Sequence, residues 1–138
     1  MGTVDRITGL KNRMYFDKRF KNIWWRCHRK NAPISLLMLD LEHLKRIHDR
    51  HGHQASDDCL KTTARILRDI LQRTGDVAAR YGGEEFVIIL PATHSDGAIV
   101  FAENTRFAVE TTNFSYNRQT YKATVSVGVG TYLPIDGI

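Results

Sequence analysis

The order of hydrophobic and polar positions divides this chain into segments of helical and extended pattern. The first segment predicts a helix that Asn12 caps and that ends near Asn31, because its apolar residues recur at three- and four-residue intervals. Those residues are Phe16, Phe20, Ile23 and Cys27. Residues 34–41 (ISLLMLDL) follow as a short, almost continuous apolar run, which is typical of a buried strand, and the one charge in this run, Asp40, lies at its carboxyl end.

Two helices are expected next. A short polar helix spans residues 42–50 and is closed by Gly52, and a longer helix begins with Ser56 as its cap and stops at Gly75. One face of the longer helix is expected to carry Leu60, Thr63, Ala64, Leu67, Ile70 and Leu71.

Residues 77–81 and 85–90 predict two strands that form a hairpin. Gly82 and Gly83 separate the strands, and glycine readily takes the positive φ values that a two-residue hairpin turn requires. Pro91 ends the second strand of this predicted hairpin.

A last helix and a last strand complete the pattern. The helix begins near Ser95 and Asp96, and residues 123–130 alternate between apolar and small polar positions, as in a strand. After the first helix the order of elements is therefore βαββαβ, which predicts an α+β, ferredoxin-like sheet with these helices on one face. We expect residues 1–138 to form a single domain. The last helix places five residues on one side: Ala98, Phe101, Ala102, Thr105 and Val109.

Composition narrows the classes of partner. The 138 residues carry a formal net charge of +5 and have a pI near 9.4, which favours an anionic partner such as a nucleotide, a nucleic acid or an acidic lipid. No DNA- or RNA-binding motif is found, so neither nucleic acid is expected as a partner. No apolar run is long enough to span a bilayer. Cys27 and Cys59 lie far apart in helical patterns and are expected to be buried thiols, as suits a reducing cytoplasm.

Acidic residues stand beside predicted buried strands at two places. Asp40 ends one strand, and Glu84 and Glu85 begin another, where a carboxylate is costly unless it is paired or bound to a cation. If the hairpin lies next to the first strand, Asp40 and Glu84 converge at one edge of the sheet, where two carboxylates and a backbone carbonyl suit Mg²⁺. The alternative is that Asp40 pairs with Lys45 while both glutamates face solvent, and the spacing alone leaves both interpretations open.

Several motifs, in order, resemble those of GGDEF domains of the diguanylate cyclase family. Residues 80–86 (R-Y-G-G-E-E-F) resemble the family signature, and residues 5–13 (D-R-I-T-G-L-K-N-R) resemble its opening motif. Residues 40–53 (D-L-E-H-L-K-R-I-H-D-R-H-G-H) resemble its metal and substrate segment, and residues 124–129 (T-V-S-V-G-V) resemble its closing strand. Ordered motifs over nearly the whole chain are far more specific than a lone G-G-E-E-F. The resemblance implies a fold like that of nucleotide cyclases and polymerase palm domains, with helices packed around the sheet.

The resemblance implies an enzyme that joins two GTP molecules into cyclic di-GMP and releases pyrophosphate, across an antiparallel homodimer. Each 3′-hydroxyl attacks the α-phosphate of the other GTP. The family pattern makes Asp40 and Glu84 the side-chain ligands of two Mg²⁺ or Mn²⁺ ions per active site, with the Leu41 carbonyl helping. Such a metal pair lowers the pKa of the attacking hydroxyl. Lys45 is expected to stabilise the transition state, and Glu85 to assist near the metals.

The resemblance also assigns contacts to the substrate and the product. Asp57 matches the guanine reader, whose carboxylate accepts from guanine N1–H and the 2-amino group; the alternative is a first-turn acid favoured by the helix dipole. The turn at Gly82 and Gly83 lets the backbone approach the nucleotide, or is a plain hairpin turn. Arg73 and Asp76 read R-x-x-D and resemble the inhibitory cyclic di-GMP site; the alternative is a salt bridge that closes the preceding helix.

Some positions depart from the family pattern. His48 replaces the Asn that shares guanine recognition with Asp57, so guanine binding is expected to be weakened or rearranged. His43 replaces a large apolar residue, and Ser56 replaces a glycine. Because the chain stops at Ile138, the family's final helix with its phosphate-contacting basic residues is missing, and we expect a fragment of a larger signalling protein. We expect this domain to be cytoplasmic without membrane contact, in a parent that can be membrane-anchored. The alternative function is a catalytically degenerate module that binds cyclic di-GMP or GTP.

Overall fold

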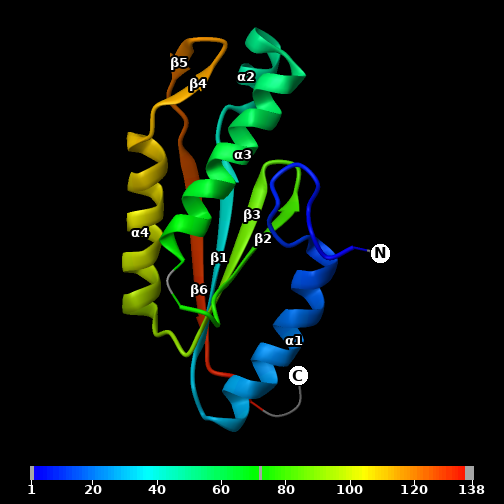
Figure 1. Ribbon diagram of the computed structural model, residues 1–138. Coiled ribbons are helices and arrows are strands. Elements are labelled where there is room, and N and C mark those ends of the chain that lie inside the picture. Colours follow the sequence, from blue (N-terminus) through cyan, green and yellow to red (C-terminus); the bar gives the residue numbers. More distant parts are fainter. Residues whose placement is uncertain (1, 72, 136–138) are drawn as a thin grey trace.

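The computed structural model describes residues 2–71 and 73–135 (Figure 1). The Asn12 side chain caps the first helix by accepting a hydrogen bond of 2.9 Å from the Tyr15 N–H, as predicted. In chain order the elements are α1 (Arg13–Arg29), β1 (Ile34–Leu41), α2 (Leu44–His51), α3 (His53–Ile70), β2 (Val77–Gly82), β3 (Glu85–Pro91), α4 (Ser95–Thr111), β4 (Phe114–Tyr116), β5 (Gln119–Tyr121) and β6 (Val125–Tyr132).

The main sheet has four strands in the order β2-β3-β1-β6, and every neighbouring pair is antiparallel. The helices α3 and α4 make the two crossovers between these strands, which gives the ferredoxin-like βαββαβ arrangement. The predicted α+β fold class is therefore confirmed. β1 lies in the interior of the sheet between β3 and β6, so its end is held on both sides by hydrogen-bonded neighbours.

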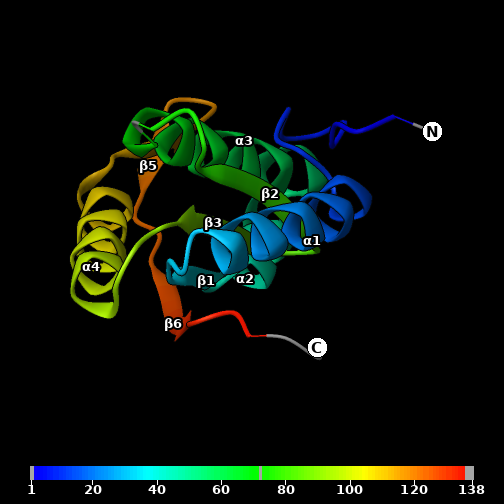
Figure 2. The same ribbon diagram turned by 90° about the horizontal axis from the view of Figure 1, so that it is seen from below.

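Both faces of β3 are buried, which explains its continuous apolar run, whereas Met38 and Asp40 on one face of β1 are exposed. One face of β3 places Phe86 and Ile88 in the core cluster that α3 and α4 cover. The other face places Val87 and Ile89 in a second cluster with Phe16 and its neighbours on α1. Figures 1 and 2 show α1 on the opposite side of the sheet from α3 and α4. The prediction of α3 and α4 on one face holds, and α1 adds the third layer.

The predicted boundaries of α3 are wrong at both ends. Gly52, with φ 93 and ψ 179, is the N-cap residue, and the helix begins at His53, three residues before the expected cap. The Ser56 hydroxyl lies inside the helix and donates to the His53 carbonyl at 2.8 Å, the local bond that a helical serine makes when it is not a cap. The helix ends at Ile70 rather than at Gly75.

A short β4–β5 hairpin was not predicted. Its strands have three residues each, and Asn117 and Arg118 between them both take positive φ, of 49 and 67. A two-residue turn of this kind usually carries glycine, and Arg118 gives no such signal. The hairpin is fixed instead by Phe114, which is fully buried, and by Tyr121, whose ring centroid lies 5.6 Å from that of Phe114.

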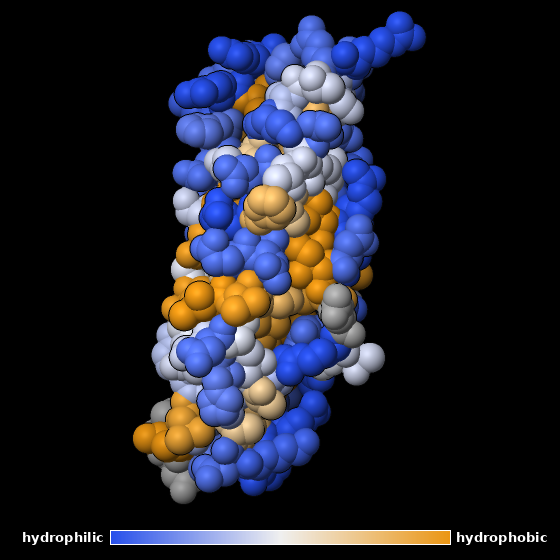
Figure 3. All heavy atoms as spheres, turned by 90° about the vertical axis from the view of Figure 1, so that its left-hand side faces the viewer, coloured by the Kyte–Doolittle hydropathy of each residue, from blue (hydrophilic) through white to orange (hydrophobic). Residues whose placement is uncertain are grey.

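The surface is largely polar, with apolar patches on the side that carries α4 (Figure 3). The exposed large apolar residues of this helix are Ile99, Val100 and Phe107. Within the described part of the chain, no helix is both long and apolar enough to cross a membrane. Cys27 and Cys59 are free and buried, in separate core clusters on opposite faces of the sheet, as expected for unpaired thiols.

Candidate active site at the β2–β3 turn

The carboxyl end of β1 lies against the β2–β3 turn. Asp40 pairs with Glu85 in the register of β1 and β3, and the Leu41 N–H donates to the Glu84 carbonyl at 3.0 Å. Residues directly opposite one another in an antiparallel pair point to the same side of the sheet, so the side chains of Asp40 and Glu85 are neighbours. The hairpin therefore does lie next to β1, as the convergence of these acids requires.

A hollow of about 310 Å³ opens beside these strand ends, and Asp40, Glu84 and Lys45 line it. The chain turns from β1 into α2 at His43, whose φ of 66 is in the left-handed region, and Lys45 follows in the first turn of α2. Among the described residues, Asp40, Glu84 and Lys45 make no ion pair. The alternative in which Asp40 pairs with Lys45 is therefore not observed.

A second hollow, of about 430 Å³, continues from the first, because Lys45 and Glu84 line both. His48 from α2 and Asp57 from α3 line the second hollow. His53 lies between these two side chains: its Nε2 is 3.7 Å from Asp57 Oδ2, and its ring centroid is 5.7 Å from that of His48. The residues predicted for metal binding and those predicted for guanine recognition thus surround one continuous depression.

The link between β2 and β3 consists of Gly83 and Glu84, because Gly82 already pairs with Glu85. Of the two glycines, only Gly83 takes a positive φ, of 47. The turn therefore lies one residue later than the predicted turn at Gly82 and Gly83. The register shifts between Arg80 and Gly82, which moves the turn one position along the chain. The Gly83 carbonyl accepts two hydrogen bonds from Arg80, at 3.0 Å from Nε and 2.7 Å from Nη2. Arg80 therefore holds the turn that carries Glu84.

Asp5 holds the same arginine from the N-terminal segment. Arg80 Nη1 lies 3.4 Å from each carboxylate oxygen of Asp5, and Thr8 donates to Asp5 Oδ2 from its N–H and its hydroxyl, at 2.8 Å each. Burial raises the pKa of Asp5, but the hydrogen bonds from Thr8 and the charge of Arg80 outweigh burial and leave this pKa below its ordinary value. The sequence predicted neither the hold of Arg80 on the turn nor the contact of Asp5 with Arg80. The two residues are 75 positions apart, and the only signal was that each stands in a family-like motif.

The strand ends offer oxygen ligands for a divalent cation. Within residues 2–71 and 73–135, no group of three or more His, Cys, Asp and Glu side chains is placed to hold a metal ion. The smaller set of Asp40, Glu84 and the Leu41 carbonyl fits Mg²⁺, which is commonly held through one or two carboxylates and keeps positions for water and phosphate oxygens. A cation here would also offset the repulsion between Asp40 and Glu85, which are like charges directly opposite one another.

Arg73 and Asp76 lie away from this depression, between α3 and β2. Arg73 Nη2 is 2.8 Å from Asp76 Oδ1 and also donates to the Pro91 carbonyl at 2.9 Å and to the Thr93 hydroxyl at 2.7 Å. The salt bridge of the alternative interpretation is therefore present, although α3 has already ended at Ile70. Among the described residues, Arg73 Nη1 has no hydrogen-bond partner, and both Arg73 and Asp76 line a hollow of about 440 Å³.

Together, the fold and the β2–β3 turn define a ferredoxin-like α+β domain with acidic side chains around a glycine turn. The family model described as "Diguanylate cyclase, GGDEF domain" matches residues 2–137, and the chain belongs to this family. Diguanylate cyclase A of Treponema denticola is 36% identical over 135 residues, a match that covers 96% of this chain and 36% of that protein. The chain thus spans about a third of the length of this relative.

Two solved structures show the same fold. Diguanylate cyclase SiaD of Pseudomonas aeruginosa, in complex with its activator SiaC, has a TM-score of 0.90 at 32% identity, and the match covers 95% of this chain and 50% of that one. The GGDEF domain of DgcB from Caulobacter crescentus, in complex with c-di-GMP, has a TM-score of 0.90 at 28% identity, and the match covers 97% of this chain and 80% of that one. The predicted family and fold are confirmed by these matches.

Proposed function

We propose that this chain is a catalytic diguanylate cyclase domain, which condenses two GTP molecules into cyclic di-GMP and releases pyrophosphate. The observation that carries the proposal is the hollow where Asp40, Glu84 and Lys45 meet without ion-pair partners among the residues that the structure describes. Two carboxylates and an ammonium left unpaired beside a glycine turn suit a metal-bound triphosphate. Membership of the GGDEF family supports the same reaction.

Asp40 and Glu84, with the Leu41 carbonyl, would hold two Mg²⁺ or Mn²⁺ ions. When bound, such ions lower the pKa of the attacking 3′-hydroxyl and neutralise charge on the phosphates. Lys45 adds a fixed positive charge at the same hollow, where negative charge develops on the α-phosphate oxygens. Glu85, opposite Asp40, increases the negative potential that attracts the cations.

In each half of the reaction, the 3′-hydroxyl oxygen of one GTP attacks the α-phosphorus of the other. The new oxygen–phosphorus bond forms while the bond from the α-phosphorus to the oxygen bridging to the β-phosphate breaks. The hydroxyl proton is released to solvent, and pyrophosphate leaves with the electron pair of the broken bond. Two such steps close the ring. Because the depression formed by Asp40, Glu84 and Lys45 would hold one GTP, we propose that two copies face each other in an antiparallel homodimer.

Guanine recognition is proposed for the second hollow. The Asp57 carboxylate, half-buried on α3, can accept from the N1–H and the 2-amino group of guanine. His48 stands where the family has an Asn that makes a second contact with guanine, and its ring packs edge-on against that of His53. The backbone at Gly83 lines the same hollow and can approach the nucleotide without a Cβ in the way.

Arg73 and Asp76 are proposed to bind the product. The Nη1 edge of Arg73 remains available for a guanine or a phosphate, and the hollow of about 440 Å³ beside it leaves room for a nucleotide base. The solved c-di-GMP complex of the DgcB GGDEF domain supports product binding by domains of this family. Because GTP is a cytoplasmic metabolite, we propose that this domain faces the cytoplasm.

The proposal is tested by incubating the protein with GTP and Mg²⁺ and measuring cyclic di-GMP by mass spectrometry. Asp40→Asn and Glu84→Gln should each lower the rate by about 10²-fold or more, because each removes a ligand of the metal–triphosphate complex. The matched control is Asp17→Asn, which changes an exposed acid on α1. Unchanged rates in both site variants would contradict the proposal. So would a wild-type protein that binds cyclic di-GMP but makes none, which would identify a binding module.

A further inference from the structure

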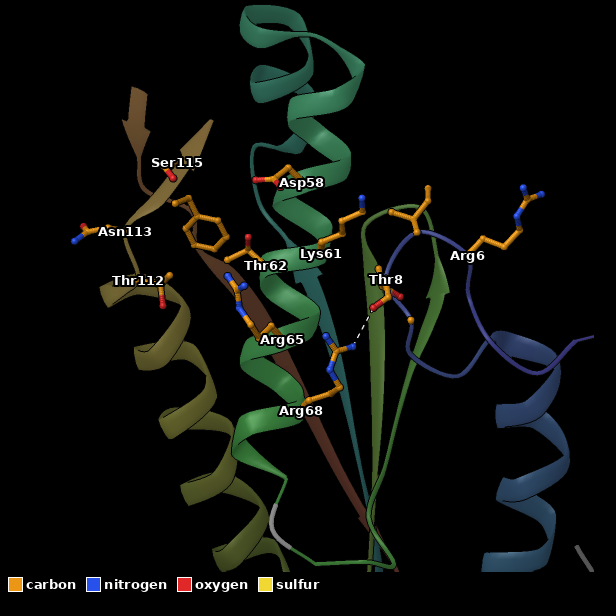
Figure 4. Close-up of a pocket in the computed structure, with 13 residues that line it drawn as sticks. Arg6, Thr8, Asp58, Lys61, Thr62, Arg65, Arg68, Thr112, Asn113 and Ser115 are labelled. Carbon is orange, nitrogen blue, oxygen red and sulfur yellow. Dashed lines mark hydrogen bonds between the residues drawn. The ribbon is translucent and has the colours of Figure 1, made fainter. Parts of the chain in front are cut away.

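A hollow of about 680 Å³ lies on the outer side of α3, between the N-terminal segment and the connection from α4 to β4 (Figure 4). None of its thirteen lining residues lines the two hollows at the β2–β3 turn, so it is a separate site. Ten of the thirteen are polar or charged, whereas sites for apolar ligands are lined mainly by hydrophobic and aromatic side chains. The lining therefore favours a polar ligand.

Three cations of α3 dominate this lining. Lys61, Arg65 and Arg68 have the spacing i, i+4 and i+7, so they share one face of the helix over roughly 10 Å. Lys61 and Arg65 have no hydrogen-bond or ion-pair partner among the described residues, and Arg68 donates to the Thr8 carbonyl at 3.0 Å. In Figure 4, Lys61 and Arg68 extend toward the N-terminal segment and Arg65 toward the other wall. Asp58, at one end, is the one acid in the lining.

Like charges at i and i+4 on a helix repel one another, and within the described residues neither Lys61 nor Arg65 makes an ion pair that would offset this repulsion. An external anion that contacts the three cations together would remove that repulsion. Guanidinium and ammonium groups in one concave site are the usual partners of phosphate oxygens.

We propose that this hollow binds a phosphate chain, a diphosphate or longer, either free or carried by a nucleotide. A single phosphate group is too small to contact cations spread over about 10 Å, whereas a chain of phosphates reaches them together. The Thr62 hydroxyl lies on the same lining and adds a neutral donor for a remaining oxygen.

Calorimetric titration with inorganic tripolyphosphate, without divalent metal and at low ionic strength, tests the proposal. The double variant Lys61→Ala/Arg65→Ala should bind about tenfold more weakly or worse, because it removes two charge-assisted contacts. Both side chains are exposed, so the variant is expected to fold. The matched control Lys21→Ala/Arg29→Ala removes the same charge from exposed positions of α1 and should bind as the wild type does. Equal losses in the two double variants, or no binding by the wild type, would overturn the proposal.

The location of the site is tested by NMR with the same ligand, and the ligand class by calorimetry with two further ligands. In ¹H–¹⁵N spectra, tripolyphosphate should shift the amides of Thr62 and Asn113. Shifts confined to Lys45, Glu84 and their neighbours would place the anion in the proposed catalytic hollow and refute the new site. A hexaglutamate peptide that binds more tightly than tripolyphosphate would overturn the assignment to phosphate. ATP binding equal to that of tripolyphosphate assigns the site to the phosphate chain alone, and tighter ATP binding assigns it to a nucleotide.

Discussion

Replacing Arg80 removes the side chain that ties the β2–β3 turn to the N-terminal segment. Arg80 donates twice to the Gly83 carbonyl and lies against the Asp5 carboxylate, and its side chain is only 15% exposed. In Arg80→Ala the turn loses both hydrogen bonds, and Asp5 keeps the two from Thr8. In Arg80→Lys the charge near Asp5 remains, but the forked geometry is lost because an ammonium is a compact point charge.

The size of the effect follows from these contacts. A hydrogen bond to a charged group contributes about 1.5–3 kcal/mol, and the two bonds from Arg80 share one acceptor and do not add in full. We expect Arg80→Ala to lower the free energy of unfolding by about 2–3 kcal/mol and Arg80→Lys by roughly half as much. Because Glu84 follows Gly83 directly, the looser turn should also lower kcat by about tenfold or more, since a displacement near 1 Å can cost about 10²-fold.

Urea unfolding followed by circular dichroism measures the first effect, and cyclic di-GMP formation under conditions where the variants stay folded measures the second. Arg29→Ala, which removes an exposed arginine at the end of α1, is the control and should match the wild type in both assays. If the stability of Arg80→Ala stays within about 0.5 kcal/mol of the wild type, or if its kcat is unchanged, the role assigned to Arg80 is wrong.

Three further predictions rest on single contacts. His48→Asn should lower KM for GTP several-fold with a smaller effect on kcat, because one regained hydrogen bond contributes about 0.5–1.5 kcal/mol; an unchanged KM would contradict this view of the guanine pocket. Arg73→Ala should weaken cyclic di-GMP binding in calorimetry, and an unaltered affinity would show that the product binds elsewhere. Asp5 has a folded-state pKa below its ordinary value, so it stabilises the fold above its unfolded pKa, near 3.8, and this contribution is lost as pH falls through the folded pKa. Asp5→Asn should therefore flatten the acid side of the stability-versus-pH curve, and an acid side as steep as that of the wild type would refute the assignment.

Most of the fold could be predicted because its core elements carry strong periodic signals. β3 is buried on both faces and is therefore a continuous apolar run, β1 is buried along one face, and α1 and α4 bury one face each. The β4–β5 hairpin could not be predicted, because three-residue strands and a turn through Asn117 and Arg118 leave no pattern. The start of α3 was predicted too late because a serine suits a cap and a helix interior equally well. In the structure Gly52 is the N-cap residue, and the Ser56 hydroxyl bonds inside the helix.

The site could be predicted where its residues lie in one local motif. Lys45, His48 and Asp57 come from two consecutive helices and do line one hollow with Glu84. Contacts between distant side chains could not be predicted, and the support of the turn by Asp5 and Arg80 is such a contact. The hollow lined by the cations of α3 was also not predicted, because an exposed helix face rich in Lys and Arg is ordinary in a sequence. It becomes a hollow only because the fold places the N-terminal segment and the α4–β4 connection beside it.

The most direct test of the central claim is to supply the protein and Mg²⁺ with a mixture of ordinary and ¹³C,¹⁵N-labelled GTP and to analyse the products by mass spectrometry. If the protein condenses two GTP molecules, cyclic di-GMP should contain the mixed species, with one labelled and one unlabelled guanosine, in the proportion expected for random pairing. Two pyrophosphates should be released for each cyclic di-GMP formed. Products limited to GDP or GMP, or unconverted GTP at a protein concentration that allows dimers to form, would contradict the proposed function.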